Sequence, residues 1–303
     1  MEEELETLRK VVLKKKITAF IIVLAIEIII SIVIFGFEPA MFPFYLFMLF
    51  VPFFISIFAG RKEYEELTKK FKVDVVHAIM KNVLGDGTEF DFNRGIPRST
   101  ISETGMMDTG DSFLYNSNDY CKGNYQGVNF EFSDVLIQEE HTDSDGDTTT
   151  VTLFRGQWYI FDFNKRFKAP LQVCEKWFGA NRTGSIFSKN RQHKVKMEDV
   201  SFNKEFNVYA KDDHDAFYVL TPNTMERIKE VNRQVPGKLL FCFKDNILHI
   251  GVNNSKDLFE LSIYKKIDLA KSGEEIRRQL EAILKFVNIL NLSNDLFIME
   301  GGD

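Results

Sequence analysis

The chain has 303 residues and a formal net charge of −6. This acidic balance excludes a surface built overall for nucleic acid or another polyanion, so no nucleic-acid partner is expected. Three widely separated cysteines form no CxxC pair, which indicates reduced, buried thiols rather than a disulfide framework. They are Cys121, Cys174 and Cys242.

Two apolar runs lie near the N-terminus, at residues 17–35 and 40–59, and only four residues (GFEP) separate them. As a helix, each run would be about 28–30 Å long, which matches the hydrocarbon core of a bilayer. A cleaved signal peptide is the alternative, but its apolar region is shorter and ends at a small-residue cleavage site. We therefore predict a transmembrane helical hairpin at residues 17–59.

Basic residues flank both runs, whereas the connecting loop has no Lys or Arg. Basic flanks stay on the cytoplasmic side of a membrane, which predicts a multi-pass cell-membrane protein with both termini in the cytoplasm. The same residues are candidates for contact with anionic lipid headgroups of the bilayer. They are Lys14, Lys15, Lys16, Arg61 and Lys62.

Glu27 falls near the middle of the first predicted transmembrane helix. An acid at that depth is costly and suggests a function, such as binding a membrane partner or a second copy of the chain. Two other roles stay open: a local hydrogen bond to Ser31 or Ser56, and proton or ion transport. Transport usually needs several polar groups along a pathway, and this hairpin shows one.

The remainder of the chain predicts an α+β protein. A juxtamembrane amphipathic helix is expected at residues 60–84 after a basic cytoplasmic N-terminus (residues 1–16), and one cytoplasmic domain at residues 85–303. This domain should be mainly antiparallel β, covered by helices, because its elements show no βαβ rhythm. Strands are expected at residues 88–92, 120–125, 128–140, 149–163 and 171–174, and hairpins at 206–210 with 216–220 and at 239–243 with 247–252.

Three further helices are expected in this domain. A short one should lie within residues 97–107. Thr221-Pro222 starts another, with Pro at its first position. A long C-terminal helix should begin at Ser272 as N-cap, with Glu275 completing a capping box.

Motifs for chemistry are weak throughout. There is no Walker loop, GxGxxG, GxSxG or HExxH, so the catalytic residues are unknown and neither cofactor nor metal is expected. Asp143, Asp145 and Asp147 alternate in one predicted turn, but Thr148 and Phe154 occupy the EF-hand positions that need Gly and Glu. A basic run is read as a solvated loop, with a membrane surface or an acidic partner as the alternative; it comprises Arg182, Lys189, Arg191, His193, Lys194 and Lys196.

Two segments carry a family resemblance. The stretch from Phe154 to Phe167 (FRGQWYIFDFNKRF) and the stretch from Phe202 to Asp212 (FNKEFNVYAKD), followed by Leu220-Thr-Pro222, resemble a bacterial membrane-anchored family called domain of unknown function 3137. Asp257-Leu-Phe259 is a weaker match. The resemblance implies a two-helix anchor and an α+β domain, but no catalytic residue. Its gene neighbourhoods also imply, by association, a membrane partner like the LemA family.

Two functions follow as hypotheses. The first is a membrane-anchored scaffold or interaction protein that binds a membrane partner or itself through the hairpin. The alternative is a membrane-tethered enzyme with an unrecognised active site in the cytoplasmic domain, which would require a pocket with converging polar groups.

Overall fold

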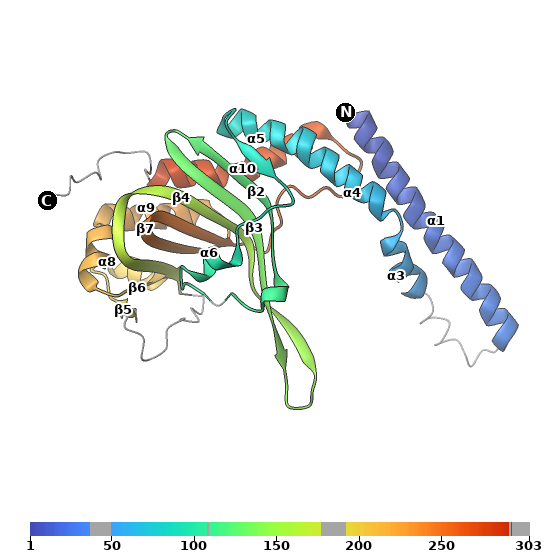
Figure 1. The fold of residues 1–303 in the computed structure, drawn as a ribbon, viewed down its shortest axis with the longest axis horizontal. Helices are drawn as coiled ribbons and strands as arrows, with labels where there is room; N and C mark the ends of the chain where they lie inside the picture. The colour runs from blue at the N-terminus through green and yellow to red at the C-terminus, as the bar shows by residue number, and fades with distance from the viewer. Residues whose placement is uncertain (37–49, 108, 177–191, 291, 293–303) are drawn as a thin grey trace. The chain divides into compact units, whose positions relative to one another are not determined.

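A computed structural model describes residues 1–36, 50–107, 109–176, 192–290 and 292, with the side chains of residues 35 and 163–169 left out. The chain divides into two compact units (Figure 1). The N-terminal unit comprises Met1–Ala78 and Phe259–Glu275, and the sheet unit comprises Ile79–Leu258 and Ile276–Asp303. Residues 259–275 therefore group with the N-terminal helices, although the sequence placed them in one domain with the sheet.

The N-terminal unit is built on one long helix, α1 (Glu2–Phe35). Residues 2–16 and the first predicted transmembrane segment form this single helix. Its 34 residues extend over about 51 Å. Helices α3 (Phe50–Phe58) and α4 (Arg61–Lys70) run antiparallel beside it (Figure 1). The helical path then continues as a π-helical segment, η2 (Phe71–Val76), and as α5 (His77–Leu84).

Among the described residues, α1 alone is long and apolar enough to cross a membrane, judged by length and composition. The predicted second membrane helix, at residues 40–59, lies largely outside the described residues. Its described part, α3, has nine residues, about 13 Å, which is less than half of a hydrocarbon core. The described chain thus shows one apolar helix of spanning length where the sequence predicted a pair.

Within its described residues, the sheet unit contains seven antiparallel strands. Their order is β1-β2-β3-β4-β6-β5, and β7 pairs with the opposite edge of β4. The strands are β1 (Glu89–Asp91), β2 (Tyr115–Tyr125), β3 (Val128–Thr142), β4 (Thr148–Glu175), β5 (His193–Val195), β6 (Phe206–Ala210) and β7 (Lys238–Asn253). This confirms the predicted α+β class with an antiparallel sheet.

Strand β4 merges two predicted strands into one of 28 residues, and β7 replaces a predicted hairpin. Asp245, at the expected turn, adopts a positive φ of 54°. The chain nevertheless does not reverse there, because Asp245 pairs with β4 and the strand continues. The register of the two strands shifts at this point. β7 thus follows β4 along most of its length, and the hairpin prediction was wrong.

The second predicted hairpin was also wrong, because residues Asp213–Val219 form helix α8. The Asp212 carboxylate accepts a hydrogen bond from the main-chain N–H of His214, which caps the first turn. Other short elements are α6 (Arg98–Ser102), the 3₁₀ turn η3 (Ser112–Leu114) and α7 (Val200–Glu205).

Two longer helices complete the fold. Helix α9 (Pro222–Gln234) starts at Thr221-Pro222 as predicted, and the Thr221 side chain caps it by accepting from the N–H of Thr224. Helix α10 (Leu269–Leu290) begins before Ser272, because the Asp268 side chain accepts from the N–H of Lys271 and starts the helix earlier. Farther along α10, the Phe286 ring packs edge-on against Tyr159 of β4, with 5.1 Å between ring centroids. The buried face of α10 consists of Ile276, Leu280, Ile283, Phe286 and Val287.

Candidate functional site

The surface of α1 changes character after Lys16. Before this point, Leu5 and Val12 are fully buried within the N-terminal unit. Beyond it, large apolar side chains are exposed on every turn, which is unfavourable in water and marks an interaction surface. The exposed residues are Ile17, Ile21, Ile22, Ile26, Ile28, Ile29, Ile30, Ile32, Val33 and Ile34.

The helices that pack antiparallel to α1 show the same change, from exposed apolar residues on α3 to charged residues on α4, beside Lys16. Helix α3 exposes Phe50, Val51, Phe53, Phe54, Ile55, Ile57 and Phe58, whereas α4 begins with charged residues. The Lys16 ammonium donates to the main-chain oxygen of Ile57 at 2.9 Å, and Lys15 Nζ lies 2.5 Å from Glu63 Oε1. Through these two bonds, the change from charged to apolar surface on α1 lies beside the same change between α4 and α3.

The five basic residues predicted to meet lipid headgroups gather at this level. They come from two segments more than 40 residues apart in sequence: Lys14, Lys15 and Lys16 from α1, and Arg61 and Lys62 from the start of α4. Lys16 is half-buried and the other four are exposed. The antiparallel pairing thus makes one basic cluster from two.

Glu27 lies within the apolar half of α1 and is half-buried. Its Oε2 atom is buried and has no hydrogen-bond partner among the described residues. The hydroxyl of Ser56, one of the two local partners considered, donates to Phe53 O at 2.7 Å instead. This carboxylate oxygen therefore remains available for a partner.

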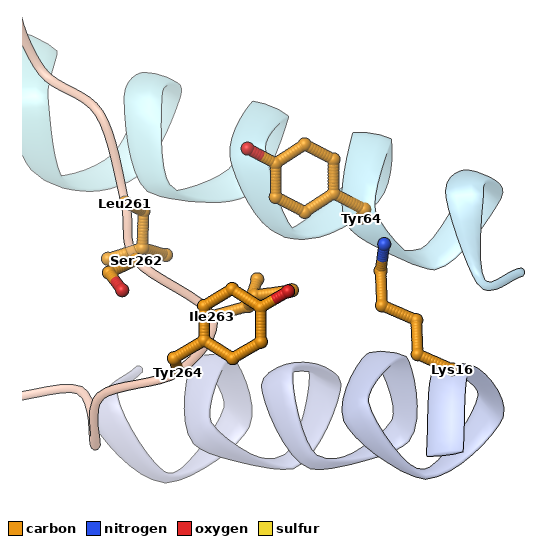
Figure 2. A pocket seen from close by; sticks show the side chains of 6 residues that line it. All are labelled: Lys16, Tyr64, Leu261, Ser262, Ile263 and Tyr264. Atoms are coloured by element: carbon orange, nitrogen blue, oxygen red, sulfur yellow. The ribbon is translucent and has the colours of Figure 1, made fainter. Parts of the chain in front are cut away.

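A pocket of about 310 Å³ lies beside the basic cluster (Figure 2). The Lys16 side chain extends into it from α1 toward α4, where Tyr64 forms part of the wall (Figure 2). The other lining residues are Leu261, Ser262, Ile263 and Tyr264. No sequence pattern predicted this pocket, because its third wall comes from about 200 residues further along the chain than Tyr64.

A buried ion pair holds this third wall on α1. Arg9 Nη2 lies 2.7 Å from Glu6 Oε1, while Arg9 Nη1 donates to Ile263 O at 2.8 Å. Glu6 also accepts a hydrogen bond from the main-chain N–H of Ile267 at 3.1 Å. The bond from Arg9, with smaller help from Ile267, lowers the pKa of Glu6 to about 2, so this carboxylate stays ionised at neutral pH.

The sheet unit holds a cluster of three carboxylates, Asp119 on β2, Asp134 on β3 and Asp257 after β7. One oxygen from each lies within 4.8 Å of the others. Asp119 is fully buried at a β-bulge and adopts a φ of 57°. Three oxygen donors of this kind suit a hard cation such as Ca²⁺ or Mg²⁺ in chemical type.

Hydrogen bonds to a neighbouring loop give Asp134 a structural role. Its Oδ1 accepts from Gln157 Nε2 at 2.9 Å, and its Oδ2 accepts from the main-chain N–H of Leu258 at 2.6 Å. Gln157 also donates to Lys256 O and accepts from Asn254. Burial, and then the nearby Asp257 carboxyl, raise the pKa of Asp134 well above its ordinary value. The cluster therefore fastens the loop after β7 to the middle of the sheet.

No motif predicted this cluster, because its members lie on three separate elements. The resembling segments nevertheless touch it through Gln157 and Asp257. Gly156, beside Gln157, is required by packing: a Cβ atom there would lie 2.0 Å from Val252 O. One of the two segments that carry the family resemblance therefore includes a point where β4 and β7 approach closely, at Gly156 and Val252.

The other polar groups noted in the sequence have local explanations. Asp143 accepts from the main-chain N–H groups of Asp145 and Asp147, which closes an exposed turn. Within the basic run, residues 193–195 form β5, while Arg182, Lys189 and Arg191 lie outside the described residues. The three cysteines are buried, as predicted, and no disulfide joins them.

Comparison with known proteins finds a family match over part of the chain and a distantly similar solved structure. No curated protein matches the chain. A solved structure, that of the mycobacterial trehalose monomycolate transport factor A, TtfA, is similar over 73% of this chain and 94% of its own, with 7% identity and a TM-score of 0.38. Residues 152–292 match a family described as "Protein of unknown function (DUF3137)". The predicted resemblance to this family is thus confirmed over residues 152–292.

Proposed function

We propose that this protein is a membrane-anchored interaction protein whose apolar helices enter the bilayer and meet a membrane partner or a second copy of the chain. The observation that carries the proposal is the coincident change of surface on α1 and on the α3–α4 pair. Exposed apolar side chains lie on one side of the Lys16–Ile57 bond and charged ones on the other. A bilayer would cover the apolar side, and the basic cluster would lie at its cytoplasmic surface.

The orientation follows from the same cluster. The chain would leave the membrane at Lys16 and at Arg61 on the same side, so residues 17–59 form a hairpin with both termini in the cytoplasm. The antiparallel course of α1 and α3 supports this topology, because the Lys16–Ile57 bond brings the start of the first apolar run beside the end of the second.

Glu27 is the residue that we propose for partner recognition. A carboxyl group in hydrocarbon favours a polar partner, since its own hydration is lost there. A helical membrane protein, or α1 of a second copy, could supply that partner. The LemA-like proteins implied by the family resemblance are one class of candidate.

An enzyme with its site in the sheet unit is the alternative. The carboxylate cluster is a place where polar groups converge, but the hydrogen bonds of Asp134 already account for that residue. We therefore assign no reaction to it.

The test has two parts. Alkaline carbonate washing of cell membranes should leave the full-length protein in the membrane pellet, whereas release into the wash would refute anchoring. Crosslinking in intact membranes should then capture a membrane protein or a second copy with wild type and lose it with Glu27→Gln. Glu66→Gln, the same change at an exposed position on α4, is the control. Equal capture by wild type and Glu27→Gln would refute the role of Glu27.

A further inference from the structure

We propose that the pocket lined by Lys16, Tyr64 and residues 261–264 binds the phosphate headgroup of an anionic phospholipid. This inference rests on the proposed anchoring, but it assigns a specific site and ligand that anchoring alone does not require. The diffuse attraction of basic residues to a membrane needs no pocket, whereas a headgroup site needs one at a defined depth.

The depth of the pocket is the first argument. Lys16 lines the pocket and also marks the last charged position before the exposed apolar half of α1. A phosphate bound beside its ammonium would lie at the polar edge of the bilayer. The acyl chains attached to the same lipid would then meet exposed side chains such as Ile17 and Ile21, which are 56% and 58% exposed.

The chemistry of the lining is the second argument. An ammonium group has three N–H donors, and the hydrogen bond from Lys16 to Ile57 O uses one of them. The hydroxyls of Tyr64, Ser262 and Tyr264 add neutral donors, while Leu261 and Ile263 provide apolar wall. The lining therefore has one cation, three hydroxyls and no acid, which suits a phosphodiester and its glycerol.

The surrounding charge is the third argument. Lys14 and Lys62 are exposed near the same level, and the pocket segment continues into the exposed residues Lys265 and Lys266. Lys15 is paired with Glu63, so its charge is locally compensated. The remaining basic excess favours anionic over zwitterionic lipid.

The aromatic residues are the fourth argument. Tyr264 is 78% exposed, although its ring is a large apolar group. Tyrosine is enriched at membrane–water interfaces, where its ring meets lipid and its hydroxyl meets water. A volume of about 310 Å³ is at the lower end for small-molecule sites and accommodates a headgroup rather than a whole lipid.

Native mass spectrometry of the full-length protein, released from neutral detergent, provides the test. Phosphatidylglycerol and phosphatidylcholine with the same acyl chains are titrated separately, and retained lipids are counted. Wild type should retain one phosphatidylglycerol in preference to phosphatidylcholine. Lys16→Gln should weaken this retention about tenfold, as expected for losing a charge-assisted hydrogen bond. Lys14→Gln removes the same charge outside the pocket and should weaken it less than about twofold.

A second variant removes hydroxyls without changing charge. Tyr64→Phe combined with Tyr264→Phe should lower retention several-fold while leaving the apolar walls in place. Equal losses for Lys16→Gln and Lys14→Gln, or equal retention of the two lipids by wild type, would overturn the inference. Neither result bears on carbonate extraction, so failure of this site is distinguishable from failure of the anchor.

Discussion

Lys16 on α1 donates a hydrogen bond to the main-chain oxygen of Ile57 on α3, with 2.9 Å between the two atoms. This bond joins the ends of two apolar helical surfaces and places a charge at their common edge. Because of this bond, the basic residues that flank the two apolar runs in the sequence lie together in the structure, beside the start of the exposed apolar surface. The proposed membrane position of the chain depends on that level.

The first prediction concerns the side of the membrane reached by each loop. Glu38→Cys should react in intact cells with a maleimide that cannot cross membranes, whereas Lys62→Cys should react only after permeabilisation. The three native cysteines are buried, so their background labelling should be low. Labelling of Lys62→Cys in intact cells would contradict the proposed orientation.

The second prediction concerns Gly156. A methyl group there would meet Val252 O at 2.0 Å, so Gly156→Ala should force β4 and β7 apart and lower the free energy of unfolding by about 1–3 kcal/mol or more. Gly87→Ala is the control, because nothing lies within 4 Å of a Cβ atom at that position. Thermal unfolding of the two variants in the same detergent would compare them, and equal stability would contradict the close approach.

The third prediction separates two carboxylates of one cluster. Asp134→Asn replaces an acceptor oxygen with a donor facing either Gln157 or the N–H of Leu258, so the variant should lose about 1–3 kcal/mol. Asp257→Asn makes the same change at an exposed side chain and reduces repulsion with Asp134, so its stability should match or exceed that of wild type. Chemical denaturation curves at neutral pH would measure both. A loss of equal size in Asp257→Asn would argue against the loop-fastening role of Asp134.

The fourth prediction is a pH dependence that arises from His249. Burial, and then the positive charge of Lys244, lower the pKa of His249 to about 4, and Nδ1 accepts from Trp158 Nε1 at 3.3 Å. Its pKa in the unfolded chain is about 6.5, so the unfolded state binds a proton first as pH falls. The stability contribution should be complete above pH 6.5 and be lost between pH 6.5 and about 4, on the order of 3 kcal/mol in total.

Unfolding measured from pH 7.5 to 4 would test this dependence. His249→Gln should flatten the profile in that window, while the exposed His214→Gln should leave it unchanged. A wild-type profile with the same slope as His249→Gln would contradict the assignment.

The fifth prediction concerns the support of the pocket wall. Arg9→Met leaves Glu6 without its guanidinium partner and Ile263 O without its donor, so stability should fall by on the order of 2–3 kcal/mol. Lys10→Met, at a side chain that is 70% exposed, should have little effect. Proteolysis near residues 259–268 should increase in the first variant and not in the second.

Local sequence patterns determined several features of this protein. The first apolar run, the alternation of strands and the Thr221-Pro222 helix start were readable because each depends on neighbours in the chain. The second membrane helix was inferred by the same kind of pattern, but the described residues show only a nine-residue helix, α3, within it. The missed elements share one cause. Lys244–Asn246 has turn chemistry, yet pairing with β4 keeps β7 extended, and the Asp212 cap makes a helix of residues that read as a strand.

The sequence by itself determined where a membrane could hold the chain, because hydrophobicity and charge act through composition over a short stretch. Only the tertiary structure decided which distant residues meet. Tyr264 reaches the pocket beside Lys16, while Asp119, Asp134 and Asp257 share one cluster on the sheet. Contacts between such distant residues depend on strand register and on the path of the chain between elements. Neither of these produces a pattern of fixed spacing in the sequence.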